Sequence, residues 1–257
     1  MSVQKTQLFK DSFYFFRTNF QIFLIVSVLT SSVIIELHDY IILKLISDTY
    51  HDSYFVENNS NFTEIIDTFF FKKKLQFIII FMLKIALRSL YNAILIGTIL
   101  STIYLVCKEK CCSFFSVAEK SISILLPLFI LQVLNNMLTE LGTILCVLPG
   151  IILQLLLLLS PVILLHSKKN ILYSIKNSII ISKDHIFFIF FTNFLFSSTK
   201  KCISLLVSTL LSDFNNSNNI YLLITHSANN FAYIVLYIIL YRFYSLETSE
   251  TKSKKNN

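Results

Sequence analysis

Residues 143–165 read TILCVLPGIILQLLLLLSPVILL, and this stretch decides the fold of the chain. Its 23 residues include no charged side chain and only a few mildly polar ones. A helix of about 20 predominantly apolar residues is long enough to cross the hydrocarbon core of a bilayer. Similar runs recur along the 257 residues, with lysines gathered between them. The pattern predicts an all-α polytopic membrane protein.

The composition excludes a soluble protein. Hydrophobic residues make up 54% of the chain and charged residues only 14%, which leaves too little polar surface to cover a soluble fold of this size. The formal charge of +7 would suggest nucleic-acid binding in a soluble protein. Here the basic residues lie in short gaps between apolar runs, where lysine and arginine orient membrane helices. The expected partner is therefore the lipid bilayer, and nucleic-acid binding is disfavoured.

The apolar runs predict six spans in a membrane domain over 19–244. They are expected at about 19–37, 86–106, 121–140, 143–165, 186–207 and 220–243. The first span lacks a convincing small-residue cleavage site, so it is expected to be retained. The long apolar region 75–106 exceeds one perpendicular span, so its first part is expected to lie at the surface.

The segments outside the spans differ in character. Residues 1–18 are expected to form a cytoplasmic interfacial amphipathic helix with Phe9, Phe13, Phe16 and Phe20 on one stripe. Residues 38–74 carry most of the acidic residues of the first half and are predicted as an outer loop. The tail 245–257 is predicted to be cytoplasmic and polar enough to be disordered.

The basic residues support this topology. The outer loops hold only Lys44 and Lys72 to Lys74. The cytoplasmic segments hold Lys5, Lys10, Arg17, Lys108, Lys110, Lys120, Lys168, Lys169, Lys176, Lys183, Arg242, Lys252, Lys254 and Lys255. This excess follows the positive-inside rule and predicts that both termini are cytoplasmic.

Lys200 and Lys201 interrupt the fifth apolar run about two thirds of the way across. One interpretation is that both ammonium groups snorkel to the outer interface along lipid. The alternative is a re-entrant segment that ends near residue 199, which would leave five spans and place the C-terminus outside.

Several short patterns resemble the YciC-type family of uncharacterised bacterial inner-membrane proteins over nearly the whole chain. They are Asp11 with Phe15-Phe16-Arg17 and Phe20, Asn92-Ala93-Ile94-Leu95, Pro149-Gly150-Ile151-Ile152 with Pro161-Val162, and Arg242-Phe243-Tyr244. The resemblance implies a six-helix protein of the cytoplasmic membrane in a Gram-negative cell. It supplies no reaction, substrate or catalytic residue.

Pro149-Gly150 lies inside the fourth apolar run, where a proline removes one backbone hydrogen bond, so a kink or a helix start is expected. Pro161 is expected to add a second break. The breaks could form a hinge that opens a pathway or a fixed bend that shapes the bundle, and the fixed bend is favoured.

Small side chains recur every four residues at Ser89, Ala93, Gly97 and Ser101. This spacing puts them on one helix face and predicts a seam where a neighbouring backbone approaches closely. The seam could join two helices of one chain, two copies in a homo-oligomer, or another membrane protein.

Two polar faces could line a path through the membrane. The first carries Lys84, Arg88 and Tyr91, and the second carries Asn230, Tyr233, Tyr237, Tyr241 and Tyr244. The two cations lie near a span end, where snorkelling costs little, so this interpretation is the weaker one. Aspartate, glutamate and histidine do not occur in the middle of a predicted span, which argues against a carboxylate-based proton relay.

The sequence predicts neither catalytic residues nor a cofactor or metal site. Cys107, Cys111 and Cys112 lie together, but a tetrahedral metal site would need a fourth ligand that is not evident nearby. With Cys146 and Cys202 they are expected to be free thiols. The five histidines are scattered singly, and no catalytic motif occurs.

The leading hypothesis is a non-catalytic structural or accessory component of the cell envelope, embedded in the inner membrane. The runner-up is a small transporter or channel for a small solute, suggested by the proline breaks and the two polar faces. A membrane-embedded enzyme is disfavoured because no nucleophile, acid and metal ligand can be brought together.

Overall fold

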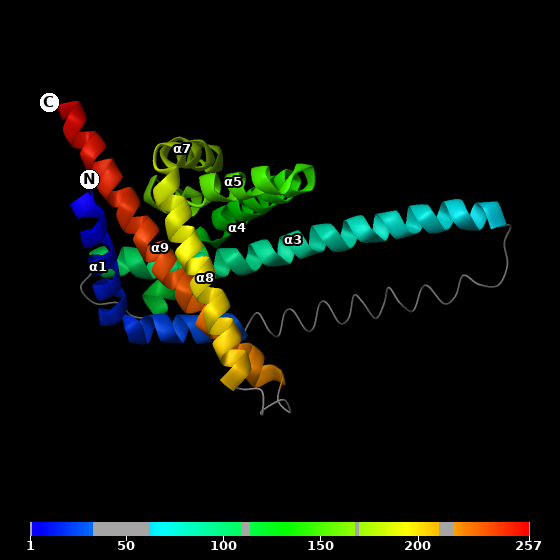
Figure 1. Ribbon diagram of the computed structural model, residues 1–257, viewed down its shortest axis with the longest axis horizontal. Helices are drawn as coiled ribbons and strands as arrows, with labels where there is room; N and C mark the ends of the chain where they lie inside the picture. Colours follow the sequence, from blue (N-terminus) through cyan, green and yellow to red (C-terminus); the bar gives the residue numbers. More distant parts are fainter. Residues whose placement is uncertain (1, 33–61, 109–113, 168–169, 211–217, 257) are drawn as a thin grey trace.

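The computed structural model describes residues 2–32, 62–108, 114–167, 170–210 and 218–256, and these contain helices and no strand (Figure 1). The predicted all-α membrane fold is confirmed. Among these residues, five helices are long and apolar enough to cross a bilayer. The bent pair Gln7–Thr18 and Phe20–Ser32 makes a sixth if it is counted as one span. The exact span boundaries from the sequence stay predictions.

The N-terminal segment is a bent pair of helices. Helix α1 (Ser2–Thr18) meets the helix Phe20–Ser32 at an angle of 77°. Around the bend the Phe16 and Phe23 rings stack at 5.9 Å, and Phe20 stacks on Phe231 of α9 at 5.6 Å. Phe9 packs against the core while Phe13 is exposed, so the expected phenylalanine stripe is divided between the bundle and the surface.

Helix α3 (Phe62–Lys108) is one uninterrupted helix of 47 residues. The expected surface segment before residue 86 is therefore wrong as a separate element, because nothing in 75–85 breaks the helix. The predicted outer loop 38–74 is already helical from Phe62, and its first part lies outside the described residues. Figure 1 shows the N-terminal end of α3 reaching far beyond the other helices.

Helix α4 (Phe114–Leu145) and helix α5 (Val147–Leu157) form an antiparallel hairpin with Cys146 at its corner. The predicted span 143–165 is therefore divided, because its first three residues end α4. Gly142 and Gly150 face each other at the corner, where a Cβ on Gly142 would come within 3.0 Å of the Gly150 Cα. Glycine is needed here because the two backbones leave no room for a side chain.

Both prolines of the fourth apolar run mark helix starts, as expected. Pro149 lies in the first turn of α5, and Pro161 lies in the first turn of helix α6 (Ser160–Ser167). Prolines fit there because the first backbone N–H groups of a helix have no intrahelical acceptor.

The C-terminal half packs around α9. Helix α7 (Ile171–Asp184) lies against α5 and α6, and helix α8 (Ile186–Leu210) runs beside helix α9 (Asn218–Asn256). Helix α8 continues through Lys200 and Lys201, so a re-entrant segment ending near residue 199 is wrong. Helix α9 continues to Asn256, so the predicted tail is helical as far as the structure describes it.

The central core lies beside a polar cavity and shares α3 and α9 residues with its wall. Its side chains come from α1, the helix Phe20–Ser32, α3, α5, α6, α8 and α9. Ten of them have no exposed surface, and five of these, which follow one another on α3 and around the start of α6, are here named the apolar layer: Ile99, Leu100, Leu159, Val162 and Ile163.

Candidate functional site: a polar cavity within the helix bundle

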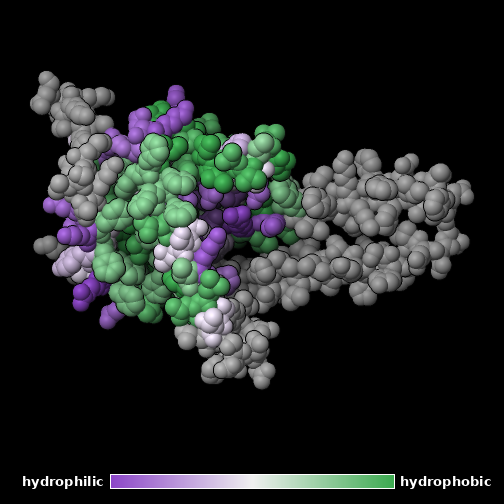
Figure 2. Space-filling view, in the orientation of Figure 1, coloured by the Kyte–Doolittle hydropathy of each residue, from purple (hydrophilic) through white to green (hydrophobic). Residues whose placement is uncertain are grey.

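A cavity of about 220 Å³ lies between α3, α4, α5 and α9. Its polar lining residues are Arg88, Asn92, Gln132, Asn135, Asn136, Thr139, Glu140, Thr143, Gln154, Tyr233 and Tyr237. Figure 2 shows hydrophilic residues gathered in a recess between hydrophobic surfaces. Polar side chains are costly inside a membrane protein and usually face a cavity or a functional site. This cavity is therefore the candidate functional site.

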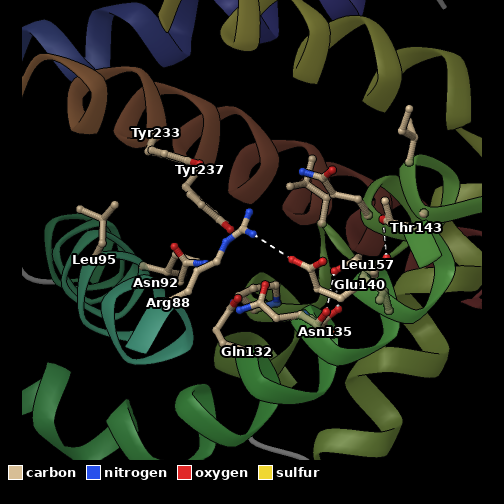
Figure 3. A pocket seen from close by; sticks show the side chains of 18 of the residues that line it. Arg88, Asn92, Leu95, Gln132, Asn135, Glu140, Thr143, Leu157, Tyr233 and Tyr237 are labelled. Atoms are coloured by element: carbon tan, nitrogen blue, oxygen red, sulfur yellow. Dashed lines mark hydrogen bonds and ion pairs between the residues drawn. The ribbon is translucent and has the colours of Figure 1, made fainter. Parts of the chain in front are cut away.

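One ion pair lies at the cavity. Arg88 Nη1 of α3 is 3.3 Å from Glu140 Oε1 of α4, and the two side chains are 57% and 33% exposed (Figure 3). The contact uses one of five guanidinium N–H donors, and a carboxylate has two oxygens. The expectation that Arg88 snorkels at the surface is thus only partly met, because it reaches an acidic partner. Lys84 on the same helix is exposed and lies outside the cavity.

The break before Pro161 organises the cavity wall. Proline has no N–H, so the carbonyl of Leu157 lacks its usual helical donor. The Ser160 hydroxyl supplies the replacement and donates to the Leu157 oxygen at 2.7 Å. The Asn135 Nδ2 then donates to Ser160 Oγ at 2.8 Å. A sequence feature that breaks a helix therefore fixes the orientation of an amide from α4.

Asn135 keeps one unused hydrogen-bonding atom. The side chain is 8% exposed, and its Oδ1 has no hydrogen-bond partner among the described residues. Buried polar atoms are nearly always paired, and an unpaired one costs about 1–3 kcal/mol. An atom of this kind in a cavity wall is a candidate contact for a bound molecule.

The predicted small-residue seam holds the neighbouring asparagine. Ser89, Ala93, Gly97 and Ser101 are all buried, and a Cβ on Gly97 would lie 3.4 Å from the Leu128 side chain of α4. Asn136 donates to Ser89 Oγ at 2.8 Å, and Ser89 donates to the Ile85 carbonyl. The seam joins α3 to α4 within one chain, so this face is covered and cannot also join two copies.

Asn230 of the second polar face lies outside the cavity. Its Oδ1 accepts a 2.7 Å hydrogen bond from the Tyr91 hydroxyl, and its Nδ2 donates to Ser31 Oγ at 3.0 Å and Thr30 Oγ1 at 3.2 Å. Ser27 of the same N-terminal helix donates to the Ser227 carbonyl of α9 at 2.7 Å. These bonds tie the helix Phe20–Ser32 to α3 and α9, so Asn230 contributes to helix packing and not to the cavity wall.

The tyrosines of α9 divide along the helix. Tyr233 and Tyr237 line the cavity, and Figure 3 shows Tyr237 pointing toward Arg88. Tyr241 and Tyr244 instead place their rings 5.9 and 5.4 Å from the ring of His166. The structure therefore brings only two of the predicted stripe residues to the site.

Lys200 contacts one of these tyrosines. Its Nζ lies 3.0 Å from the centroid of the Tyr233 ring, which is a cation–π contact. The neighbouring Lys201 is exposed. The lysine pair therefore separates into one half-buried cation beside the cavity-lining tyrosine and one surface cation.

Sequence reasoning missed Glu140 and the amides of α4. The predicted span 121–140 ended at Glu140, whereas α4 continues for five residues and brings this carboxylate to the cavity. The spacing of Gln132, Asn135, Asn136, Thr139 and Thr143 was a readable signal. These residues follow the helical repeat and so share one face of α4.

The described residues contain no group of three or more His, Cys, Asp and Glu side chains that could hold a metal ion. Cys107, Cys146 and Cys202 are free and exposed. Cys111 and Cys112 lie outside the described residues. No catalytic or cofactor-binding residue was predicted from the sequence, and the polar cavity is the candidate site that the described residues offer.

Residues 1–246 match the model of an uncharacterised protein family, UPF0259. A UPF0259 membrane protein of Buchnera aphidicola subsp. Acyrthosiphon pisum (strain APS) is 31% identical over 190 residues, covering 74% of this chain and 75% of the relative. A UPF0259 membrane protein of Buchnera aphidicola subsp. Schizaphis graminum (strain Sg) is 27% identical over 252 residues, which cover 96% of this chain and 98% of the relative. No solved structure matches the chain. The expected resemblance to an uncharacterised bacterial membrane family is confirmed.

Proposed function

Since the chain belongs to the uncharacterised membrane-protein family UPF0259, we propose that it is a non-catalytic accessory component of the bacterial inner membrane. Both termini lie in the cytoplasm in this proposal. The excess of lysine and arginine in the segments assigned to the cytoplasm supports the orientation. The α4–α5 corner then faces the outer side, and the cavity opens in the outer half of the membrane.

The observation that carries the proposal is the apolar layer, whose residues follow cavity-lining residues along the chain. On α3 this layer begins at Ile99, less than two turns after Asn92 and three residues after the cavity-lining Ile96. On α6 it contains Val162 and Ile163, directly after Pro161. Because a water-filled channel needs polar or open walls along its whole length, this packing favours a closed bundle that holds a pocket.

Reconstitution into vesicles tests the closed bundle. We expect potassium efflux from vesicles that contain the purified protein to equal efflux from empty vesicles. A variant with Ile99→Asn and Ile163→Asn serves as the control, because polar groups in the apolar layer should admit water and raise the efflux. Efflux through the wild-type protein well above the empty vesicles would overturn the proposal.

The second candidate is a small transporter, favoured by the helix breaks that border the cavity at Pro149 and Pro161. Such a protein would expose the cavity alternately to both sides of the membrane. The test places a single cysteine at Tyr237 in a background without the native cysteines. An impermeant maleimide is then added to spheroplasts or to inverted vesicles.

The two candidates predict different labelling. A closed accessory bundle should label Tyr237→Cys only in spheroplasts, from the outer side. A transporter should label it from both sides. Lys84→Cys, at an exposed position outside the cavity, should react only from the outer side in either case and so reports the orientation of the vesicles. A fluorescent protein fused after Asn257 tests the orientation separately and should fluoresce in the cytoplasm.

A further inference from the structure

We infer that the polar cavity binds a molecule that carries a primary ammonium group and an anionic phosphate or carboxylate on a short linker. Asn135 Oδ1 accepts a hydrogen bond from the ammonium, and Arg88 holds the anionic group. The inference goes beyond the proposed accessory role and does not depend on whether the protein conducts solutes.

The deep end of the site requires a hydrogen-bond donor. Ser160 gives its only hydroxyl proton to the Leu157 carbonyl, so it can only accept from Asn135. The amide NH₂ of Asn135 must therefore face Ser160, and the atom of this cavity-lining side chain that is left without a partner is the carbonyl oxygen Oδ1. This oxygen is buried and has no partner among the described residues.

A second asparagine repeats this arrangement one residue later. Ser89 gives its proton to the Ile85 carbonyl and accepts from the Asn136 Nδ2. The NH₂ group of Asn136 is thereby directed to α3, and its carbonyl oxygen is the remaining polar atom. Two neighbouring amides of the cavity wall thus use their donors on serines and keep acceptors, which favours a ligand with several N–H donors.

The other end of the site supplies opposite charges. Glu140 lies five residues after Asn135, about 7.5 Å along the helix axis at 1.5 Å per residue. Its carboxylate is paired with the Arg88 guanidinium, which keeps donors beyond this one contact for an anionic group. Arginine binds phosphate and carboxylate groups well because its donors form a planar fork. A short zwitterion satisfies both ends.

The cavity volume agrees with a ligand of this size. At about 30 Å³ for each water molecule in the liquid, 220 Å³ corresponds to several waters or to one small molecule. The same chemistry has two sources, namely a free aminoalkyl phosphate or the headgroup of an aminophospholipid. Both carry the primary ammonium that Asn135 would recognise.

The test uses two probes that differ only at nitrogen. Phosphoethanolamine carries three N–H donors, whereas the trimethylammonium of phosphocholine carries a similar charge and no donor. Titration calorimetry of the purified full chain in phosphatidylcholine nanodiscs should show saturable binding of phosphoethanolamine. Because a hydrogen bond to a charged group contributes about 1.5–3 kcal/mol, phosphocholine should bind at least about tenfold more weakly.

Two variants address the two ends of the ligand. Asn135→Leu removes the acceptor and should weaken phosphoethanolamine binding at least about tenfold. Its matched control is Asn229→Leu, because Asn229 also has a buried Oδ1 without a partner in the described part of the chain but lies outside the cavity. This control should leave binding unchanged.

Arg88→Gln gives an independent reading if Asn135→Leu fails to fold, because Arg88 is half exposed and tolerates substitution. It should weaken phosphoethanolamine binding and leave the much weaker binding of ethanolamine, which lacks phosphate, unchanged. Equal loss with both probes would overturn the role of Arg88 and with it the inference.

A lipid arm distinguishes the two sources. Protein transferred from phosphatidylethanolamine to phosphatidylcholine nanodiscs is analysed for retained phosphatidylethanolamine by native mass spectrometry. Retention by the wild type and its loss in Asn135→Leu identify a lipid headgroup, while binding of free phosphoethanolamine without retention identifies a solute. Equal binding of phosphoethanolamine and phosphocholine would show that the cavity does not recognise the N–H donors and would overturn the inference. Absence of saturable binding in either arm would mean that the cavity holds water only and would overturn it as well.

Discussion

The polar cavity and the apolar layer are built in part by the same helix and yet have opposite character. On α3 the cavity is lined by Arg88 and Asn92, and the apolar layer contains Ile99 and Leu100. On α4 the fully buried Leu128 and Leu131 precede the amides that line the cavity. The chain therefore changes from apolar packing to polar chemistry within two turns of one helix.

The difference teaches what holds a membrane bundle together. Lipid tails are as apolar as leucine, so the hydrophobic effect does not distinguish an apolar neighbour helix from lipid. The apolar layer is stabilised by close packing, while the polar half is stabilised by hydrogen bonds whose alternative is an unpaired group in a low-dielectric medium. Substitutions that affect packing and substitutions that affect hydrogen bonds should therefore change the free energy of unfolding by different amounts.

The largest effect is expected at the α4–α5 corner that closes the polar half. Any Cβ on Gly150 would approach the Thr143 Cα to 2.9 Å, and backbone atoms cannot move aside as a side chain can. Gly150→Val should therefore destabilise the protein by more than the ~1–3 kcal/mol typical of overpacking and abolish the folded state. Gel filtration of a fluorescent fusion in detergent measures this as loss of the monodisperse peak.

The control for this prediction is Gly97→Ala. Its Cβ would meet only the tip of Leu128, at 3.4 Å, and alanine favours a helix by up to about 1 kcal/mol over glycine. The monodisperse peak should remain. Equal behaviour of the two variants would show that the corner is not closely packed.

The second largest effect is expected in the apolar layer. Ile163→Ala removes a fully buried side chain and should lower the free energy of unfolding by roughly 2–5 kcal/mol, because its packing contacts are lost. Leu205→Ala on α8 is the comparison, since Leu205 is 66% exposed on a helix that faces mainly outward. Unfolding titrations in mixed micelles should show little change for Leu205→Ala, and a similar loss for both would contradict the division into layer and surface.

A smaller effect is expected from the hydrogen bonds that anchor the N-terminal helix. The Tyr91 hydroxyl and Asn230 Oδ1 are 2.7 Å apart. A double-mutant cycle of Tyr91→Phe and Asn230→Ala should give a coupling of about 0.6–1.7 kcal/mol, the range for hydrogen bonds between membrane helices. Tyr14→Phe, at an exposed tyrosine, is the control and should not couple to Asn230→Ala. A coupling energy near zero would show that the hydrogen bond between Tyr91 and Asn230 does not stabilise the contact between these helices.

The smallest effect on stability is expected from the Arg88–Glu140 pair. Because the two side chains are 57% and 33% exposed, Arg88→Gln should change the free energy of unfolding by only about 0.2–1 kcal/mol. The same titrations measure it, with Lys84→Gln as the control at an exposed cation without a role in the cavity. A loss of several kcal/mol would show that the pair is part of the scaffold rather than of the site.

Much of the fold could be read from the chain because membrane insertion depends on local hydrophobicity. The helix starts at Pro149 and Pro161 and the seam of Ser89, Ala93 and Gly97 also followed from local rules. Element boundaries were less accurate. The corner at Cys146 depends on the contact of Gly142 with Gly150, which are far enough apart that only packing brings them together.

The candidate site was only partly predictable. Arg88, Tyr233 and Tyr237 were recognised as polar face residues, but Glu140 was assigned to the end of a span. Asn230 belonged to the same predicted stripe as Tyr233 and yet contacts a different helix. Residues on one helical stripe drift around the axis over several turns, so neighbouring helices decide which of them share a cavity.

The sequence by itself determined that this protein is helical and resides in a membrane, because transfer into lipid is a sum over local side chains. Tertiary structure alone decided that a cavity-lining amide from α4 keeps a buried, unpaired oxygen. That outcome requires Pro161 to free a carbonyl, Ser160 to bind it and Asn135 to bind Ser160. Hydrogen-bond geometry of this kind depends on contacts between segments that are distant in the chain, and no local pattern contains it.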